Sequence, residues 1–193
     1  MAFERDPEKL YPHDRLLAKT LVPLIPPWVT PNMITWLRII LTPVVLWFLY
    51  IGDYQIGVPL FIFVAFTDAL DGSLARLRKQ ITEWGTFYDP MADKLLIGSV
   101  VLLVVVRHIN PIFGILIVLI EVLLLIGGYW RRRAGRPVSA NVVGKAKMFL
   151  QFLGVTLLLV EVWSGAQLFL DVSIATLSLA IVVAVVSLFT YGI

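Results

Sequence analysis

Long apolar stretches separated by short clusters of charge constrain this chain more than any other feature. A helix that spans a bilayer needs about 20 mostly apolar residues. Six segments have that character: Asn32–Tyr50, Gln55–Leu77, Met91–Val106, Ile112–Tyr129, Ala146–Trp163 and Leu168–Tyr191. In composition, 59% of the residues are hydrophobic and only 15% are charged, against about 25% charged in soluble domains. The sequence predicts an all-α integral membrane protein with six transmembrane helices, in a single domain over 1–193.

The first thirty residues form a predicted juxtamembrane segment. Acidic and basic residues are mixed there, and no apolar core with a small-residue cleavage site follows, so no signal peptide is predicted. Within this segment, Lys9–Val22 combines leucines and charges in a pattern typical of an amphipathic helix in the headgroup region. A solvated tail is the alternative. Several prolines then break the chain before the membrane: Pro23, Pro26, Pro27 and Pro31.

The distribution of lysine and arginine predicts the orientation. Most of the 16 basic residues lie in the N-terminal segment, after the second apolar segment, or between the fourth and the fifth. The loops on the opposite side carry Arg107 alone. Because cytoplasmic loops are enriched in Lys and Arg, we expect both termini of this multi-pass cell-membrane protein to face the cytoplasm. An even number of helices requires the two termini to lie on the same side.

The cysteine and histidine content argues against disulfides, cysteine catalysis and histidine-based metal sites. Cysteine is absent, so disulfides, thiolate metal ligands and a cysteine nucleophile are excluded. The histidines, His13 and His108, lie far apart in the sequence, which argues against a histidine-based metal site. We expect contacts with membrane lipids and no nucleic-acid partner.

Four aspartates interrupt the uncharged pattern of the membrane segments. Asp68 and Asp71 are three residues apart, and Asp89 and Asp93 are four apart, so each pair shares one face of a helix. Ionisable residues at membrane depth are costly and indicate function. We expect the second helix to end near Arg76. Asp68 then lies roughly 12 Å inside that end.

These carboxylates need a counter-charge, because four of them cannot all stay ionised side by side in a low dielectric. Mg²⁺ takes oxygen ligands, typically one or two carboxylates plus phosphate oxygens, so the set suits one or two ions that hold a phosphoryl group. Gly72 and Ala75 leave a side-chain-poor surface beside the carboxylates. Taken singly, these residues have simpler interpretations: Asp68 as an interfacial cap, Asp89 before Pro90 as a helix N-cap, and Gly85 as a turn residue.

The spacing of these residues resembles the signature of the CDP-alcohol phosphotransferase family. That signature is D-x2-D-G-x2-A-R-x8-G-x3-D-x3-D, and it occurs here without a departure. Its positions are Asp68, Asp71, Gly72, Ala75, Arg76, Gly85, Asp89 and Asp93. The six expected helices and the expected cytoplasmic motif extend the resemblance over nearly all of the chain.

The resemblance implies a reaction, an assembly and residue roles. Such enzymes move a phosphatidyl group from CDP-diacylglycerol to an alcohol and release CMP, while a smaller set joins a CDP-amino-alcohol to diacylglycerol. They are homodimers of six-helix subunits with a polar cavity open to the cytoplasm. Carried over, the four aspartates would bind Mg²⁺ or Mn²⁺, with two ions expected, and Asp93 would also be the general base. Asn32, Gly72, Ala75 and Gly85 would line the CDP pocket, with Arg76 on the diphosphate.

Two further motifs resemble the phosphatidylglycerophosphate synthase subgroup, whose acceptor is glycerol 3-phosphate. One is P-N-x-x-T-x-x-R, formed by Pro31, Asn32, Thr35 and Arg38; the other is D-P-x-A-D-K over Asp89–Lys94. Arg38 lies inside the membrane, so we expect it to have an anionic partner and assign it to the acceptor phosphate. Alternatively, Asn32 and Thr35 only cap the helix and Arg38 extends to the headgroups.

Lys145 and Lys147 open the fifth helix, where positive charge opposes the helix dipole, so we expect an anionic ligand nearby. A phosphorylated acceptor fits. Anionic lipid headgroups are the alternative, and we favour it for Arg131–Arg133 and Arg136. The subgroup carries an arginine–glutamate pair in its fourth helix, whereas this chain has Ile120 and Glu121. Inositol phosphate, serine and phosphatidylglycerol therefore stay open as acceptors, and Glu121 is expected to be a hydrogen-bonded partner inside the bundle.

Three other classes of protein fit the sequence less well. A cation transporter would place its carboxylates near the midplane on broken helices. A membrane prenyltransferase would carry its paired aspartates on two well-separated helix pairs of a longer chain. A non-catalytic lipid-binding scaffold would need no such set of carboxylates.

Overall fold

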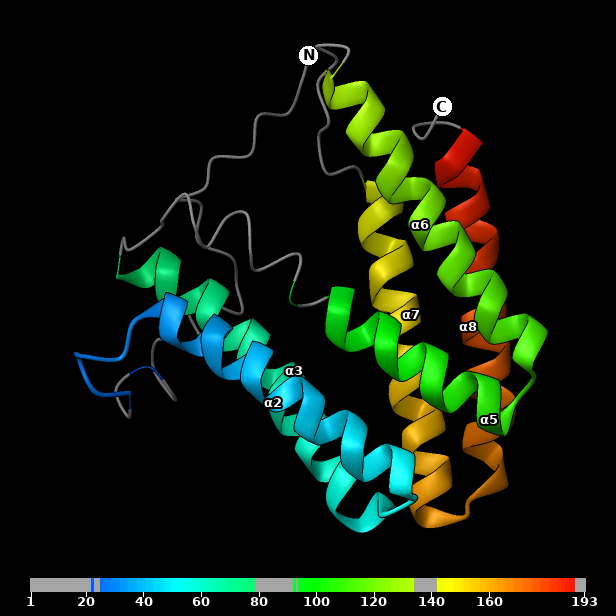
Figure 1. Cartoon of the computed structure of the whole chain (residues 1–193), viewed down its shortest axis with the longest axis horizontal. Coiled ribbons are helices and arrows are strands. Elements are labelled where there is room, and N and C mark those ends of the chain that lie inside the picture. Colours follow the sequence, from blue (N-terminus) through cyan, green and yellow to red (C-terminus); the bar gives the residue numbers. More distant parts are fainter. Residues whose placement is uncertain (1–21, 23–24, 79–91, 93, 134–141, 190–193) are drawn as a thin grey trace.

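The computed structural model describes residues 22, 25–78, 92, 94–133 and 142–189 (Figure 1). All regular secondary structure in these ranges is helical, which confirms the predicted all-α class. Among the described residues, five helices are long and apolar enough to cross a membrane. They are α2 (Pro31–Ile51), α3 (Tyr54–Leu77), α6 (Pro111–Arg133), α7 (Val142–Ser164) and α8 (Gln167–Ser187).

The sixth expected span, Met91–Val106, lies partly outside the described residues. Residues 94–100 are α-helical and continue into the π-helix η2 (Val101–Val105) and then α5 (Val106–His108). The predicted segment is therefore helical where it is described, and its start lies outside the described residues. The expected amphipathic helix over Lys9–Val22 also lies outside the described residues, except for Val22.

Local sequence signals explain where α2 and α3 begin and end. The Thr30 side chain accepts a hydrogen bond from the backbone N–H of Met33 at 3.3 Å, and Pro31 takes the first turn, where a missing N–H costs nothing. Gly52 ends α2 with φ of 82°, a left-handed conformation that favours glycine. The Asp53 carboxylate then accepts from the N–H of Ile56 at 3.3 Å in the first turn of α3.

Helices α2 and α3 form one antiparallel hairpin and α7 and α8 form a second, with the helix over residues 94–108 between them. Figure 1 shows α2 beside α3 and α7 beside α8, and η2 contacts α2, α6 and α7. The buried core draws on all of them, including Val45, Leu49, Phe61, Val64, Val100, Val104, Ile117, Val155, Leu158 and Leu177. Large apolar side chains such as Trp36, Trp47 and Leu179 are exposed instead, as expected for a surface that faces lipid.

Small residues let the helices approach closely. A Cβ added at Gly154 of α7 would lie 2.6 Å from the Leu177 side chain of α8, and the Ser173 hydroxyl donates to the Gly154 carbonyl at 2.7 Å. A Cβ at Gly57 of α3 would likewise lie 2.8 Å from the Leu49 side chain of α2. Close packing around small residues is a main source of helix association in membranes.

Polar contacts also join the helices at the end opposite the aspartate motif. The Tyr54 hydroxyl and His108 Nε2 lie 3.1 Å apart, and His108 Nδ1 lies 3.1 Å from the Val104 carbonyl. Since a carbonyl only accepts, Nδ1 carries a proton and donates it to Val104. On the same side, Trp163 Nε1 donates to Gln55 at 3.0 Å, which joins α7 to α3.

Candidate functional site

The antiparallel α2–α3 hairpin brings a charged residue of each helix to the same level. Arg38 lies seven residues after the start of α2 at Pro31, and Asp71 lies six residues before the end of α3 at Leu77. At 1.5 Å per residue, both lie about 10 Å from that end of the hairpin. Two charges that are far apart in the sequence thus meet inside the bundle.

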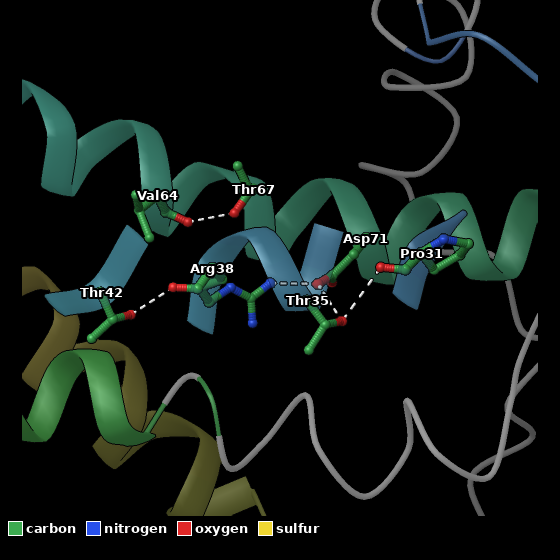
Figure 2. A network of polar contacts seen from close by, with 7 residues as sticks. All are labelled: Pro31, Thr35, Arg38, Thr42, Val64, Thr67 and Asp71. Carbon is green, nitrogen blue, oxygen red and sulfur yellow. Dashed lines mark hydrogen bonds and ion pairs between the residues drawn. The ribbon is translucent and has the colours of Figure 1, made fainter. Parts of the chain in front are cut away.

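Arg38 and Asp71 form a buried ion pair. Nη2 of Arg38 donates to Oδ2 of Asp71, and the side chains are 0% and 2% exposed (Figure 2). The Thr35 hydroxyl lies 3.4 Å from the same Oδ2 and 3.4 Å from the Pro31 carbonyl. Two groups of α2, the Arg38 guanidinium and the Thr35 hydroxyl, therefore lie within hydrogen-bonding distance of one carboxylate oxygen of α3.

The structure argues against the capping interpretation of Thr35 and the headgroup interpretation of Arg38 at the start of α2. Thr30 is the N-cap, and Thr35 is buried against Asp71 one turn further on, so Thr35 is not a cap. Asn32 lies in the first turn and is partly buried. Because the Arg38 side chain is buried, it does not extend to the headgroups. Its expected anionic partner is Asp71, and its predicted contact with the acceptor phosphate is not tested by this arrangement.

The structure describes only some of the remaining motif residues. The backbone of Asp68 lies in α3, three residues before Asp71, and Gly72 and Ala75 are partly buried in the same helix. Arg76 belongs to the last turn of α3, and its side chain is not described. Gly85, Asp89 and Asp93 lie outside the described residues. Within the described part of the chain, no three His, Cys, Asp or Glu side chains form a group that can hold a metal ion.

The described part of the motif has the chemistry that a hard divalent cation needs. Asp71 supplies carboxylate oxygens at a buried position, and its charge is matched by Arg38. Aspartates at 68, 89 and 93 would complete an all-oxygen donor set, which Mg²⁺ and Mn²⁺ prefer over nitrogen or sulfur. The residues thus fit a magnesium-type ion.

The two lysines assigned to the acceptor lie in different surroundings. Lys145 is exposed in the first turn of α7, whereas Lys147 is buried and forms an ion pair with Glu121 of α6. The expected hydrogen-bonded partner role of Glu121 is therefore seen, with Lys147 as its partner. Glu121 and Lys147 border a cavity of about 290 Å³ between α6, α7 and the helix over residues 94–108. The polar residues that line it are Lys94, Ser99, Glu121, Lys147 and Gln151.

Arg78 has a role that the sequence did not reveal. It follows the last residue of α3, and its guanidinium donates to the carbonyls of Val29 at 2.7 Å and Ile25 at 2.8 Å. This contact ties the segment before α2 to the end of the motif helix. The sequence marked Arg78 only as one of the basic residues that indicate a cytoplasmic loop, because carbonyl partners leave no trace in side-chain patterns.

Comparisons with known proteins indicate one protein family. A family model described as CDP-alcohol phosphatidyltransferase matches residues 28–190. The CDP-diacylglycerol–glycerol-3-phosphate 3-phosphatidyltransferase of Rickettsia felis is 32% identical over 148 residues, which cover 74% of this chain and 81% of that protein. The Bacillus subtilis protein of the same name is 32% identical over 147 residues, 68% of this chain and 76% of its own. A Drosophila melanogaster protein named "Probable cardiolipin synthase (CMP-forming)" is 39% identical over 98 residues, 50% of this chain and 30% of its own.

Proposed function

The chain belongs to the CDP-alcohol phosphatidyltransferase family, and we propose that it transfers the phosphatidyl group of CDP-diacylglycerol to glycerol 3-phosphate. The products would be phosphatidylglycerophosphate and CMP. It is thus a transferase of phospholipid biosynthesis and a multi-pass membrane protein. The observation that carries the choice of acceptor is the similarity to two bacterial enzymes named for glycerol 3-phosphate, each aligned over about three quarters of its length or more, 81% and 76%.

In this proposal the metal site binds two divalent ions, Mg²⁺ or Mn²⁺. Its ligands are Asp68, Asp71, Asp89 and Asp93. When bound, the metal would neutralise the diphosphate and stabilise charge on the phosphoryl oxygens and on the departing CMP. Support comes from the buried, charge-matched Asp71 and from the all-oxygen character of the set.

The other motif residues act on the substrates. Asp93 takes the proton of the acceptor hydroxyl as that oxygen attacks the phosphorus. Arg76 binds the diphosphate, for which a guanidinium offers paired donors. Asn32 and the small residues Gly72, Ala75 and Gly85 form the CDP pocket, because short side chains let the nucleotide approach the backbone.

Lys145 and Lys147 bind the acceptor phosphate in this proposal. Lys145 is exposed at the start of α7, and Lys147 lines the same cavity as Lys94, the residue after Asp93. Since Lys147 is held by Glu121, binding of a phosphate there requires the lysine to share or exchange this partner.

Phosphatidylglycerol is the second candidate acceptor. The Drosophila relative named for cardiolipin synthesis matches half of this chain, and apart from its five polar residues the cavity beside Lys147 is lined by apolar side chains such as Leu95, Leu102 and Val122. An apolar lining suits a lipid acceptor better than it suits glycerol 3-phosphate.

An acceptor screen separates the two candidates. Purified protein in detergent, with CDP-diacylglycerol and Mg²⁺, is given glycerol 3-phosphate, phosphatidylglycerol, inositol phosphate, inositol or serine, and CMP release is measured. We expect release with glycerol 3-phosphate alone. Release with phosphatidylglycerol and none with glycerol 3-phosphate would make the chain a cardiolipin synthase instead.

We also propose that the enzyme is a homodimer whose termini and active site face the cytoplasm. The Lys and Arg distribution supports the orientation, and the family resemblance supports the dimer. Mass measurement of the protein–detergent complex by multi-angle light scattering tests the dimer, for which the expected protein mass is twice 21.7 kDa.

A further inference from the structure

We propose that Arg38, assisted by Thr35, is a positioning residue for the metal site: from α2 it fixes the orientation of the Asp71 carboxylate on α3. The predicted ligands all lie on α3 or on the segment that follows it. Arg38 and Thr35 thus bring α2 into the site. This inference rests on the proposed metal role of Asp71. It adds two residues, Arg38 and Thr35, that contact Asp71 and not the metal.

The geometry carries the proposal. Arg38 Nη2 and Thr35 Oγ1 both reach Oδ2 of Asp71 (Figure 2), and two donors that converge on one oxygen restrict rotation of the carboxylate plane. Metal-binding carboxylates are commonly oriented in this way by hydrogen-bonding partners that do not touch the metal. Arg38 is the stronger of the two, since it pairs directly with Asp71, whereas the Thr35 hydroxyl lies 3.4 Å from Oδ2 and 3.4 Å from a carbonyl that competes for its one proton.

The residue type suits this task. A guanidinium stays charged throughout the accessible pH range and has a planar, rigid set of donors. The Arg38 side chain is 0% exposed, so packing holds it in one place. A side chain enclosed in this way is better suited to hold Asp71 than to capture a soluble acceptor.

A positioning role and a mere counter-charge role predict opposite signs for metal affinity. If Arg38 only balances charge, its removal leaves the site more negative, and a divalent cation binds more tightly. If Arg38 orients Asp71, its removal weakens metal binding, by about 10–100-fold for partners of this kind. Metal affinity without substrate therefore distinguishes the two roles.

The test is Mn²⁺ binding to purified protein in detergent, with free Mn²⁺ measured by electron paramagnetic resonance. We expect Arg38→Gln to weaken binding about tenfold or more, and Arg38→Lys to recover part of the loss. Thr35→Val should weaken binding less than Arg38→Gln, and Thr35→Ser should bind as the wild type does. The matched control is Arg107→Gln, because Arg107 donates to the Tyr50 carbonyl at the other end of the bundle.

Asp71→Asn separates the two levels of the proposal. If Asp71→Asn weakens Mn²⁺ binding while Arg38→Gln and Thr35→Val bind as tightly as the wild type or more tightly, the positioning role is overturned and the metal role of Asp71 stands. If Asp71→Asn itself binds like the wild type, the metal role fails and the inference fails with it. Size-exclusion chromatography confirms folding, and Arg38→Lys and Thr35→Val keep the test decisive if Arg38→Gln does not fold.

Discussion

Arg38 and Asp71 form their ion pair at positions where the side chains are 0% and 2% exposed. Removing one partner of such a pair leaves the other charge buried without compensation, which typically costs about 3–5 kcal/mol, whereas replacing both by apolar residues is often nearly neutral. Loss of either residue alone is therefore expected to destabilise the α2–α3 hairpin, whereas replacement of both by apolar residues is not.

The first prediction at this scale concerns stability. Arg38→Met should lower the free energy of unfolding by about 3–5 kcal/mol, measured in detergent with EDTA present so that metal plays no part. The double variant Arg38→Met with Asp71→Leu should recover most of the loss. Arg107→Met, at an exposed carbonyl contact, should change stability by less than about 1 kcal/mol. Equal losses of unfolding free energy in the two arginine variants would show that the buried ion pair matters no more to stability than the exposed contact of Arg107.

The second prediction concerns Lys147. Loss of a charge-assisted hydrogen bond to phosphate costs about 1.5–3 kcal/mol, so Lys147→Met should raise the KM for glycerol 3-phosphate roughly tenfold to a hundredfold and leave the KM for CDP-diacylglycerol unchanged. Because this variant also leaves Glu121 without its lysine, the control is the double variant with Glu121→Gln. A double variant with a wild-type KM would show that Lys147 only neutralises Glu121.

At the scale of single helices, close contacts between backbones determine the packing. Gly154 has no space for a side chain, because a Cβ would lie 2.6 Å from the buried Leu177. Gly128 of α6 has nothing within 4 Å of the same position. These two helical glycines therefore form a matched pair that separates tertiary packing from intrinsic helix propensity.

Alanine substitution at these two glycines should have opposite effects. Gly154→Ala should destabilise the protein by about 1–3 kcal/mol through overpacking between α7 and α8. Gly128→Ala should be neutral or stabilise it by up to about 1 kcal/mol, since alanine favours the helix over glycine. Thermal unfolding in detergent measures both. A stabilised Gly154→Ala protein would contradict the close approach of the two helices.

The sequence predicted the existence of the helices better than their ends. Hydrophobicity marks the part of a helix that lies in lipid, so the expected start at Ala146 missed the residues from Val142, and the expected end at Tyr129 missed the arginines up to Arg133. Arginine is a good helix former, and a helix does not end where its charged residues begin. The π-helical turn at Val101–Val105 had no signal in a run of similar aliphatic residues.

For the molecule as a whole, spacing along the chain indicates which aspartates form the proposed site but not the partners that other helices supply. The pairs of aspartates follow helical periodicity, so the sequence reveals them. The Arg38–Asp71 and Lys147–Glu121 contacts join different helices, and a single sequence does not specify which faces of two helices meet. It therefore indicated that Arg38 needs an anion without naming Asp71.

Orientation in the membrane is testable because the chain contains no cysteine. Single cysteines at Arg133 and Gln167, both exposed and at opposite ends of the bundle, can be labelled in intact cells with a membrane-impermeant maleimide. We expect labelling of Gln167→Cys in intact cells and of Arg133→Cys only after permeabilisation. The reverse pattern would contradict the proposed placement of the termini in the cytoplasm.

The most direct test of the central claim is CMP release from CDP-diacylglycerol by the purified protein, measured for the wild type and for Asp71→Asn. The wild type should release CMP only when glycerol 3-phosphate and Mg²⁺ are both present, and EDTA should abolish the reaction. Asp71→Asn should be at least about a hundredfold slower, as expected when a group that acts in the transition state is lost. Acceptor-dependent release at the wild-type rate by Asp71→Asn, or in EDTA, would contradict metal-dependent phosphatidyl transfer at this site.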